Sequence, residues 1–167
     1  EGLNGGVIYY DGQFDDSRLA INLAQTMAEN NGIPINYFEV SGLIKSDNGI
    51  IKGVEATDKI SGRKYSIQAK VVVNATGVFA DEIMQMDQPG AKKTITPSQG
   101  IHIILDQSFL QSSSAIMIPK TSDGRVLFAV PWHGKVVVGT TDTPIEHATL
   151  EPRALEQEVE FILHTAA

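Results

Sequence analysis

The chain has 167 residues, of which 42% are apolar and 20% charged, as in a soluble globular protein with enough apolar material for a core. Its net charge of −7, with no basic cluster longer than Lys92-Lys93, argues against a nucleic-acid groove, which needs clustered Lys and Arg. The lack of cysteine excludes disulfides and thiolate chemistry, and no apolar run reaches the length of a membrane span.

The first ninety residues predict a mixture of helices and strands. Apolar residues recur at helical spacing up to Asn31-Gly32, which tolerates the positive φ of a helix end. β-Branched and aromatic runs separated by turn residues indicate strands. The expected elements are a strand at 6–10, a helix over about 19–27, a strand at 35–40, a hairpin at 50–57 and 64–70, a strand at 71–76 and a helix near 79–87.

The run Val71–Val73 enters Asn-Ala-Thr-Gly without any alternating polar residue. Such a run predicts a strand that is buried on both faces. Gly77 then supplies a position where the backbone can turn or approach a ligand closely. From the pattern alone, an ordinary turn between a strand and a helix is the more frequent reading.

The character of the sequence changes after Pro89-Gly90. Turn pairs at Asp123-Gly124 and His133-Gly134 separate runs at hairpin spacing, which predicts an antiparallel sheet. The expected elements are strands at 101–105, 115–119, 125–131 and 135–140 and a helix over about 152–165. The chain therefore divides near residue 90. Because it begins with Glu1 and ends within an expected helix, we expect an internal part of a longer protein.

Five segments carry a resemblance to a known family. In this order and with compatible spacing, they resemble the FAD-dependent glycerol-3-phosphate dehydrogenases. The segments are YYDGQFDDSRLAINLA at 9–24, VVVNATG at 71–77, TPSQGIHIIL at 96–105, DGRVLFAVPW at 123–132 and GTTDT at 139–143.

The resemblance implies an α/β (α+β) fold made of two parts of such an enzyme. Residues 1–10 would form a short strand at the edge of the substrate lobe, and residues 11–90 the later part of the FAD-binding domain. Residues 91–167 would form the antiparallel sheet of the substrate domain with its C-terminal helix. The family's Gly-x-Gly-x-x-Gly loop, which places the pyrophosphate on a helix N-terminus, does not occur here. We therefore expect this segment alone to retain no FAD and to be inactive.

The implied activity is the oxidation of glycerol 3-phosphate to dihydroxyacetone phosphate, by hydride transfer to FAD. Electrons would pass to a quinone or, in oxidase relatives, to oxygen. Such an enzyme would serve glycerol metabolism in a bacterium, in the cytoplasm and peripheral to the inner face of the membrane, with a homodimer as one native assembly. Nucleic acid is not expected because of the net charge. Metal is not expected either, because the remaining histidines are scattered and have few acids near them in the sequence.

His102 is the candidate catalytic residue. Alternation places it on the opposite sheet face from Ile101 and Ile103. A lone histidine in an apolar strand is more often structural, but the position matches the histidine of the family's Ser-x-Gly-x-His motif. An imidazole titrates near neutral pH and can accept the hydroxyl proton of an alcohol that is being oxidised. The same motif makes Ser98 and Gly100 candidates on the substrate side.

The candidate cofactor contacts come from the resemblance alone. Ala75, Thr76 and Gly77 would lie beside the dinucleotide part of FAD, and Val40, at the end of its strand, would offer backbone atoms to the adenine. The sequence departs from the family at Val78-Phe79, where Gly-Pro-Trp is usual.

A second departure is Gln99, which stands where lysine is usual and removes a charge near a site for a phosphorylated substrate. Two alternatives stay open. One is another flavin oxidoreductase of the same superfamily, acting on an amino acid or a 2-hydroxy acid, and Gln99 slightly favours this alternative. The other is a non-catalytic interaction module with exposed edge strands.

Overall fold

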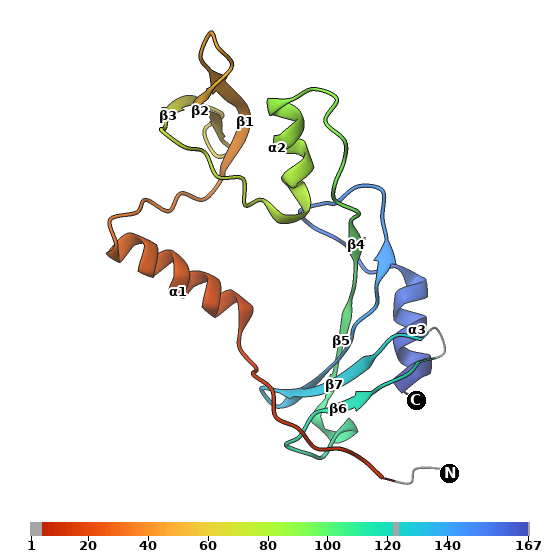
Figure 1. Cartoon of the computed structure of the whole chain (residues 1–167). Helices are drawn as coiled ribbons and strands as arrows, with labels where there is room; N and C mark the ends of the chain where they lie inside the picture. The colour runs from red at the N-terminus through yellow and green to blue at the C-terminus, as the bar shows by residue number, and fades with distance from the viewer. Residues whose placement is uncertain (1–4, 122–123, 167) are drawn as a thin grey trace. The chain divides into compact units, whose positions relative to one another are not determined.

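The computed structural model describes residues 5–121 and 124–166, and the chain forms two compact units (Figure 1). The first unit runs to Val72 and the second starts at Val73. The predicted division near residue 90 therefore differs from the observed one.

The boundary shifts because Asp81 ties the helix around it to the segment that follows. Its Oδ2 accepts hydrogen bonds from the backbone N–H groups of Thr94, at 3.0 Å, and Ile95, at 2.9 Å. Its Oδ1 accepts a hydrogen bond from Thr94 Oγ1 at 2.8 Å. The helix consequently groups with the second unit.

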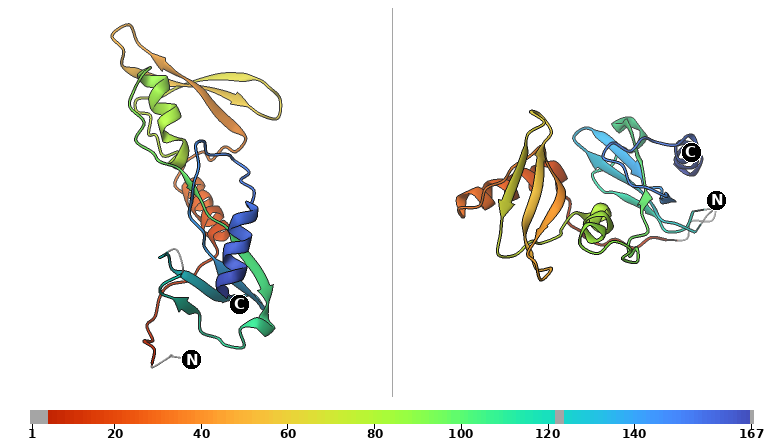
Figure 2. Two further views of the ribbon diagram at one scale, coloured as in Figure 1. Left: turned by 90° about the vertical axis from the view of Figure 1, so that its right-hand side faces the viewer. Right: turned by 90° about the horizontal axis from the view of Figure 1, so that it is seen from above.

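The first unit contains one helix and one antiparallel sheet. Helix α1 (Asp16–Glu29) begins at the cap residue Asp15, whose carboxylate accepts a hydrogen bond from Arg18 N at 3.0 Å. Asn31 has a φ of 63° just after the helix, as predicted from Asn31-Gly32. Figure 2 shows the twisted sheet of the order β1-β2-β3. Its strands are β1 (Phe38–Lys45), β2 (Ile51–Asp58) and β3 (Lys64–Gln68), so the predicted hairpin is confirmed.

Two strand predictions in the first unit are wrong. Residues 6–10 have no regular secondary structure. β1 starts at Phe38 instead of residue 35, because Tyr37 has a φ of 57°, which lies outside the extended region. Val40 consequently lies inside β1, where it pairs with Ala56, and not at the end of a strand.

The predicted buried strand at 71–76 is also wrong. Among the described residues no strand pairs with this run, and Val71 and Val73 are 74% and 80% exposed. A β-branched run favours extended backbone, but it becomes a strand only when a neighbour accepts its hydrogen bonds.

The second unit is built around a four-stranded antiparallel sheet of the order β5-β8-β7-β6. The predicted strands and the helix near 79–87 are confirmed, with shifted ends. The elements are η1 (Gly77–Phe79), α2 (Ala80–Asp87), β4 (Ser98–Gln99), β5 (His102–Asp106), η2 (Gln107–Phe109), β6 (Ile116–Ile118), β7 (Leu127–Trp132), β8 (Lys135–Gly139), β9 (Thr143–Pro144) and α3 (Glu156–Ala166).

The predicted turn at His133-Gly134 joins β7 to β8, with φ angles of 46° and 74°. Of the other predicted turn, Asp123 lies outside the described residues and Gly124 has a φ of 84°. Helix α3 begins at Glu156, so Pro152 precedes the helix and does not occupy its first turn as predicted.

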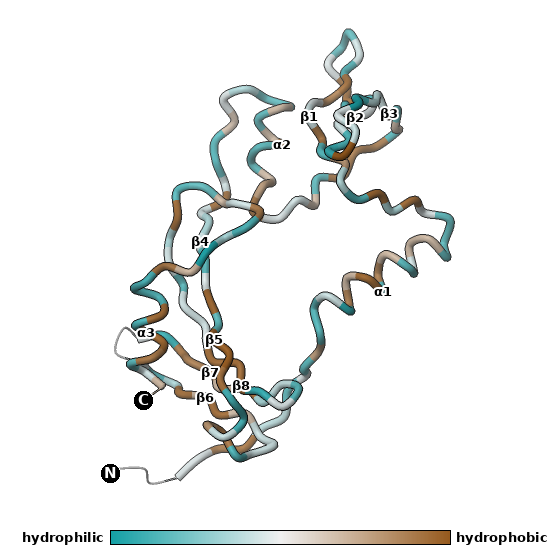
Figure 3. Tube along the Cα trace, turned by 180° about the vertical axis from the view of Figure 1, so that it is seen from behind, coloured by the Kyte–Doolittle hydropathy of each residue, from teal (hydrophilic) through white to brown (hydrophobic). Residues whose placement is uncertain are grey.

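The core of the second unit lies between α3 and one face of the four-stranded sheet. Leu127, Val136, Val138 and Ile162 are buried there and contact one another. Figure 3 shows that apolar residues follow β5, β7 and β8. Within the second unit α3 packs on this face, and the opposite face of the sheet holds the predicted catalytic residue.

Within the described ranges, none of the helices has both the length and the apolar character needed to cross a bilayer. In the same ranges, no three His, Asp or Glu side chains lie together as a metal site would require.

Candidate functional site

His102 is the first residue of β5, and its side chain is exposed. Side chains alternate along this strand: Ile103 and Leu105 pack against the core beneath α3, whereas His102 and Ile104 are exposed. The imidazole therefore lies on the sheet face away from α3, opposite to Ile101 and Ile103 as predicted.

Gly139 makes room for this imidazole. Strand register places His102, Gly139, Phe128 and Met117 in one row across the four strands. A Cβ built on Gly139 would lie 2.5 Å from Cδ2 of His102. The ring therefore occupies the space over β8 that any other residue would fill with its own side chain.

The surroundings of His102 on this face are apolar. The next row along the strands consists of Ile104, Val137 and Val130, and Ile104 is 70% exposed. We call the side chains of both rows the histidine face: His102, Ile104, Met117, Phe128, Val130 and Val137. An apolar surface of this kind can contact a planar ligand, and its single imidazole can exchange a proton.

The segment before His102 is held closely against the segment that follows β8. β4 pairs with β9, and the N–H of Ile101 donates a hydrogen bond to Thr141 Oγ1 at 2.9 Å. A Cβ on Gly100 would lie 2.2 Å from the carbonyl oxygen of Thr141. Close packing of two backbones thus requires a glycine at position 100. Ser98 is exposed and pairs with Pro144.

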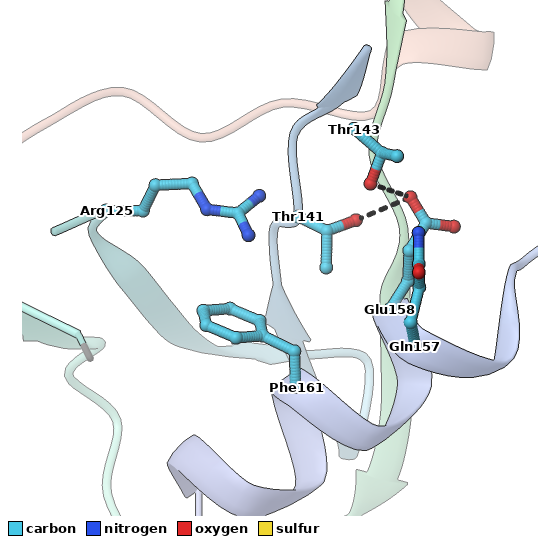
Figure 4. Close-up of a pocket in the computed structure, with 6 residues that line it drawn as sticks. All are labelled: Arg125, Thr141, Thr143, Gln157, Glu158 and Phe161. Carbon is cyan, nitrogen blue, oxygen red and sulfur yellow. Dashed lines mark hydrogen bonds between the residues drawn. The ribbon is translucent and has the colours of Figure 1, made fainter. Parts of the chain in front are cut away.

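Below these two segments lies a buried carboxylate, Glu158 of α3, which is 2% exposed. Its Oε1 accepts hydrogen bonds from the hydroxyls of Thr141, at 3.1 Å, and Thr143, at 2.8 Å (Figure 4). Its Oε2 accepts hydrogen bonds from Gln99 Nε2 and from the backbone N–H of Leu155, both at 2.9 Å.

Two opposing effects act on this carboxyl group. Burial raises the pKa of Glu158, but the hydrogen bonds from Leu155, Thr143, Gln99 and Thr141 together lower it below its ordinary value of 4.5. Glu158 is therefore ionised at neutral pH, and as a carboxylate it can only accept hydrogen bonds.

The side chain of Gln99 belongs to this cluster. Its Nε2 donates to Glu158 and also to the carbonyl oxygen of Arg153, at 3.1 Å. The amide thus points toward α3, whereas His102 lies on the other face. The presence of Gln99 in place of the family's usual lysine therefore removes no charge from the histidine face.

A cavity of about 230 Å³ lies beside the carboxylate (Figure 4). Arg125 crosses it: the guanidinium carbon lies 4.6 Å from the ring centre of Phe161, and Nη1 donates to the carbonyl oxygen of Asp142 at 3.1 Å. These contacts make Arg125 part of the packing of α3. The residues that line the cavity are Arg125, Thr141, Thr143, Gln157, Glu158 and Phe161.

The predicted cofactor residues form a separate turn in the second unit. Asn74 Oδ1 accepts a hydrogen bond from Thr76 Oγ1 at 2.8 Å, and Asn74 Nδ2 donates to the carbonyl oxygen of Ala80 at 3.0 Å. Ala75, Thr76 and Gly77 are exposed. Gly77 has a φ of 57°, and nothing lies within 4 Å of a Cβ built on it.

The structure brings some predicted site residues together and separates others. Ser98, Gly100 and His102 lie on one continuous segment against Thr141. The turn at 75–77 makes its own local contacts, and Val40 belongs to the first unit.

Sequence reasoning marked residues 139–143 as a segment of the resemblance, but it missed Glu158 and the contacts that Gly139 and Thr141 make beside His102. A signal existed for Glu158, because it lies four residues before the buried Ile162 and therefore shares the apolar side of its helix. An acid at such a position needs hydrogen-bond donors. No comparable signal existed for Gly139, since its role depends on strand register.

Comparison with known proteins places this geometry in context. The model of the DAO family, described as FAD dependent oxidoreductase, matches residues 1–167. A probable mitochondrial glycerol-3-phosphate dehydrogenase of Dictyostelium discoideum is 47% identical over 98% of this chain and 26% of its own length. The mitochondrial glycerol-3-phosphate dehydrogenase of Homo sapiens is 36% identical over 97% of this chain and 23% of its own length.

A solved structure is also similar. The glycerol-3-phosphate dehydrogenase from Bacillus halodurans, complexed with FAD, has a TM-score of 0.84 and 34% identity to this chain. The match covers 91% of this chain and 30% of that one. The chain spans about a quarter of the length of the curated relatives it matches.

Proposed function

Because the chain belongs to the DAO family of FAD-dependent oxidoreductases, we propose that it works within an enzyme that oxidises glycerol 3-phosphate to dihydroxyacetone phosphate. The names of the relatives support this substrate. The observation that carries the proposal is the exposed imidazole of His102 on the histidine face, where the neighbouring side chains are apolar.

The residues of the chain fit a planar, phosphorylated cofactor in two places. The histidine face is apolar apart from its imidazole, which suits contact with a flavin ring. The turn at Ala75, Thr76 and Gly77 has small side chains, and there is open space beside Gly77. The side chain of Thr76 makes no capping hydrogen bond to the N–H groups of η1. We assign this turn to the dinucleotide part of FAD and the backbone of Val40 to the adenine.

The chemistry that bound FAD would supply is the acceptance of a hydride from C2 of the substrate. The hydroxyl proton must also be accepted by a base, because otherwise a carbonyl cannot form at that carbon. His102 is the group we propose as the general base. Ser98, exposed on the same segment, would contact the substrate, and Gly100 would keep that segment against Thr141.

Further parts of the proposal concern the surroundings of the enzyme. We propose a quinone as electron acceptor, with oxygen as the alternative, a homodimer, and a peripheral position on a membrane. The relatives named above include mitochondrial enzymes of eukaryotes, which supports a mitochondrial location. The bacterial source and the cytoplasmic location expected from the sequence stay predictions.

The test is the rate of flavin reduction by glycerol 3-phosphate without oxygen, in an FAD-loaded enzyme that contains this sequence. We expect His102→Ala to slow reduction by roughly 10²–10⁴-fold, the usual effect of removing a general base. The control is His147→Ala, since His147 is exposed and lies outside the histidine face.

The pH dependence sharpens this test. If His102 accepts the proton, the rate of reduction falls toward acid pH in the parent enzyme, and His102→Ala loses this acid limb. A variant with full FAD occupancy and a parental rate would refute the role of His102. Equal reduction by a 2-hydroxy acid or an amino acid would refute the substrate.

A further inference from the structure

The buried carboxylate of Glu158 is connected to the catalytic strand through a single hydroxyl group. Thr141 Oγ1 donates to Glu158 Oε1 at 3.1 Å and accepts a hydrogen bond from the N–H of Ile101 at 2.9 Å. Ile101 directly precedes His102. A path of two hydrogen bonds therefore leads from α3 to the residue beside the imidazole.

The ionised state of Glu158 fixes the direction of this path. A carboxylate cannot donate, so the Thr141 hydroxyl must point its hydrogen at Glu158 and its lone pair at Ile101. The same carboxylate holds Gln99 through Nε2 and Thr143 through Oγ1. It thus fastens both segments that meet at the end of the four-stranded sheet.

The segments so fastened determine where His102 lies. Ile101 directly precedes His102 at the start of β5, and Thr141 lies two residues after Gly139, the last residue of β8. The imidazole occupies the space over Gly139 with little tolerance, because an added Cβ would lie 2.5 Å from its Cδ2. A small shift of either segment would therefore displace the ring from its place on the histidine face.

We propose that Glu158 and Thr141 are positioning residues for His102. Both are buried, Glu158 on α3 and Thr141 beside it, and they act by fixing the start of β5 against the end of β8. This inference rests on the proposed function, because it assumes that His102 takes part in the reaction. A misplacement of about 1 Å at a catalytic group can cost on the order of 10²-fold in rate.

The test uses Thr141→Val, which keeps the shape of the side chain and removes the hydroxyl, with Thr141→Ser as the matched control. In the FAD-loaded enzyme we expect Thr141→Val to slow flavin reduction by roughly 10- to 100-fold. Thr141→Ser should keep the rate within about threefold of the parent rate, because serine retains both hydrogen bonds. Glu158→Gln provides a second perturbation of the same path, because its amide would place an NH2 donor against the donors Gln99 Nε2 and Leu155 N–H.

A double-mutant cycle separates positioning from a general structural effect. If Thr141 acts through His102, Thr141→Val should have little further effect on the rate in a His102→Ala background. A loss of equal size in both backgrounds would overturn the inference and indicate a structural role alone. So would a parental rate for Thr141→Val.

The cycle also distinguishes the two proposals. If His102→Ala reduces its flavin at the parental rate, the role of His102 fails and the positioning role fails with it. If His102→Ala is slow but Thr141→Val and Glu158→Gln are both as fast as the parent, only the positioning role fails. FAD absorbance and urea midpoints of each variant establish that the compared enzymes are loaded and folded.

Discussion

Replacing Gly139 with alanine tests whether His102 occupies the space over β8. The new Cβ would lie 2.5 Å and 3.0 Å from Cδ2 and Cγ of His102, and 2.8 Å from the carbonyl oxygen of Ile101. Cβ atoms essentially never approach other atoms within 3.0 Å, so the ring and the neighbouring backbone must move. Overpacking of this kind costs about 1–3 kcal/mol. We expect Gly139→Ala to lower the free energy of unfolding by about that amount.

The assay is urea unfolding followed by tryptophan fluorescence. Trp132 is the only tryptophan and lies in β7 of the same sheet, so its emission reports on the second unit. The matched control is the same substitution in a His102→Ala background. Two of the three close contacts involve imidazole atoms, so Gly139→Ala should cost less there, although the contact with Ile101 remains. A parental urea midpoint for Gly139→Ala would refute the reasoning, and so would equal costs in both backgrounds.

Two further expectations concern stability. Folding lowers the pKa of Glu158, so its ionised form contributes stability above about pH 4.5. This stability is lost as the pH falls through the lower pKa of the folded state. Urea midpoints measured over this range should therefore fall less steeply in Glu158→Gln than in the parent. Leu127 is fully buried in the core, so Leu127→Ala should lower the free energy of unfolding by about 2–5 kcal/mol, whereas Leu150→Ala, at an 87% exposed position, should stay within about 0.5 kcal/mol of the parent in the same assay.

Local sequence pattern was sufficient for elements whose partners lie nearby in the chain. The hairpin of β2 and β3 and the turn at His133-Gly134 follow from turn residues between β-rich runs. The placement of His102 on the sheet face opposite to Ile103 follows from simple alternation along β5. Each of these predictions depends on contacts between close neighbours, and each is confirmed.

Pattern failed where a structure depends on partners that the local sequence does not specify. Val71–Val73 have every property of a buried strand except a strand to pair with. The role of Gly139 depends on the strand register that places it beside His102. The division of the chain was misplaced because the hydrogen bonds of Asp81 to the backbone at Thr94 cannot be read from composition.

The two faces of the four-stranded sheet explain why the site is built as it is. One face must pack against α3 to form a core, so its side chains are fixed by burial; the other face is free to present His102. A histidine on an exposed face has few contacts of its own to hold it. Its position must therefore be set from the buried side, through the backbone of its strand. Glu158 is suited to this task because it is the only buried acid among the described residues, and its oxygens accept hydrogen bonds from both segments that lead to His102 and away from Gly139.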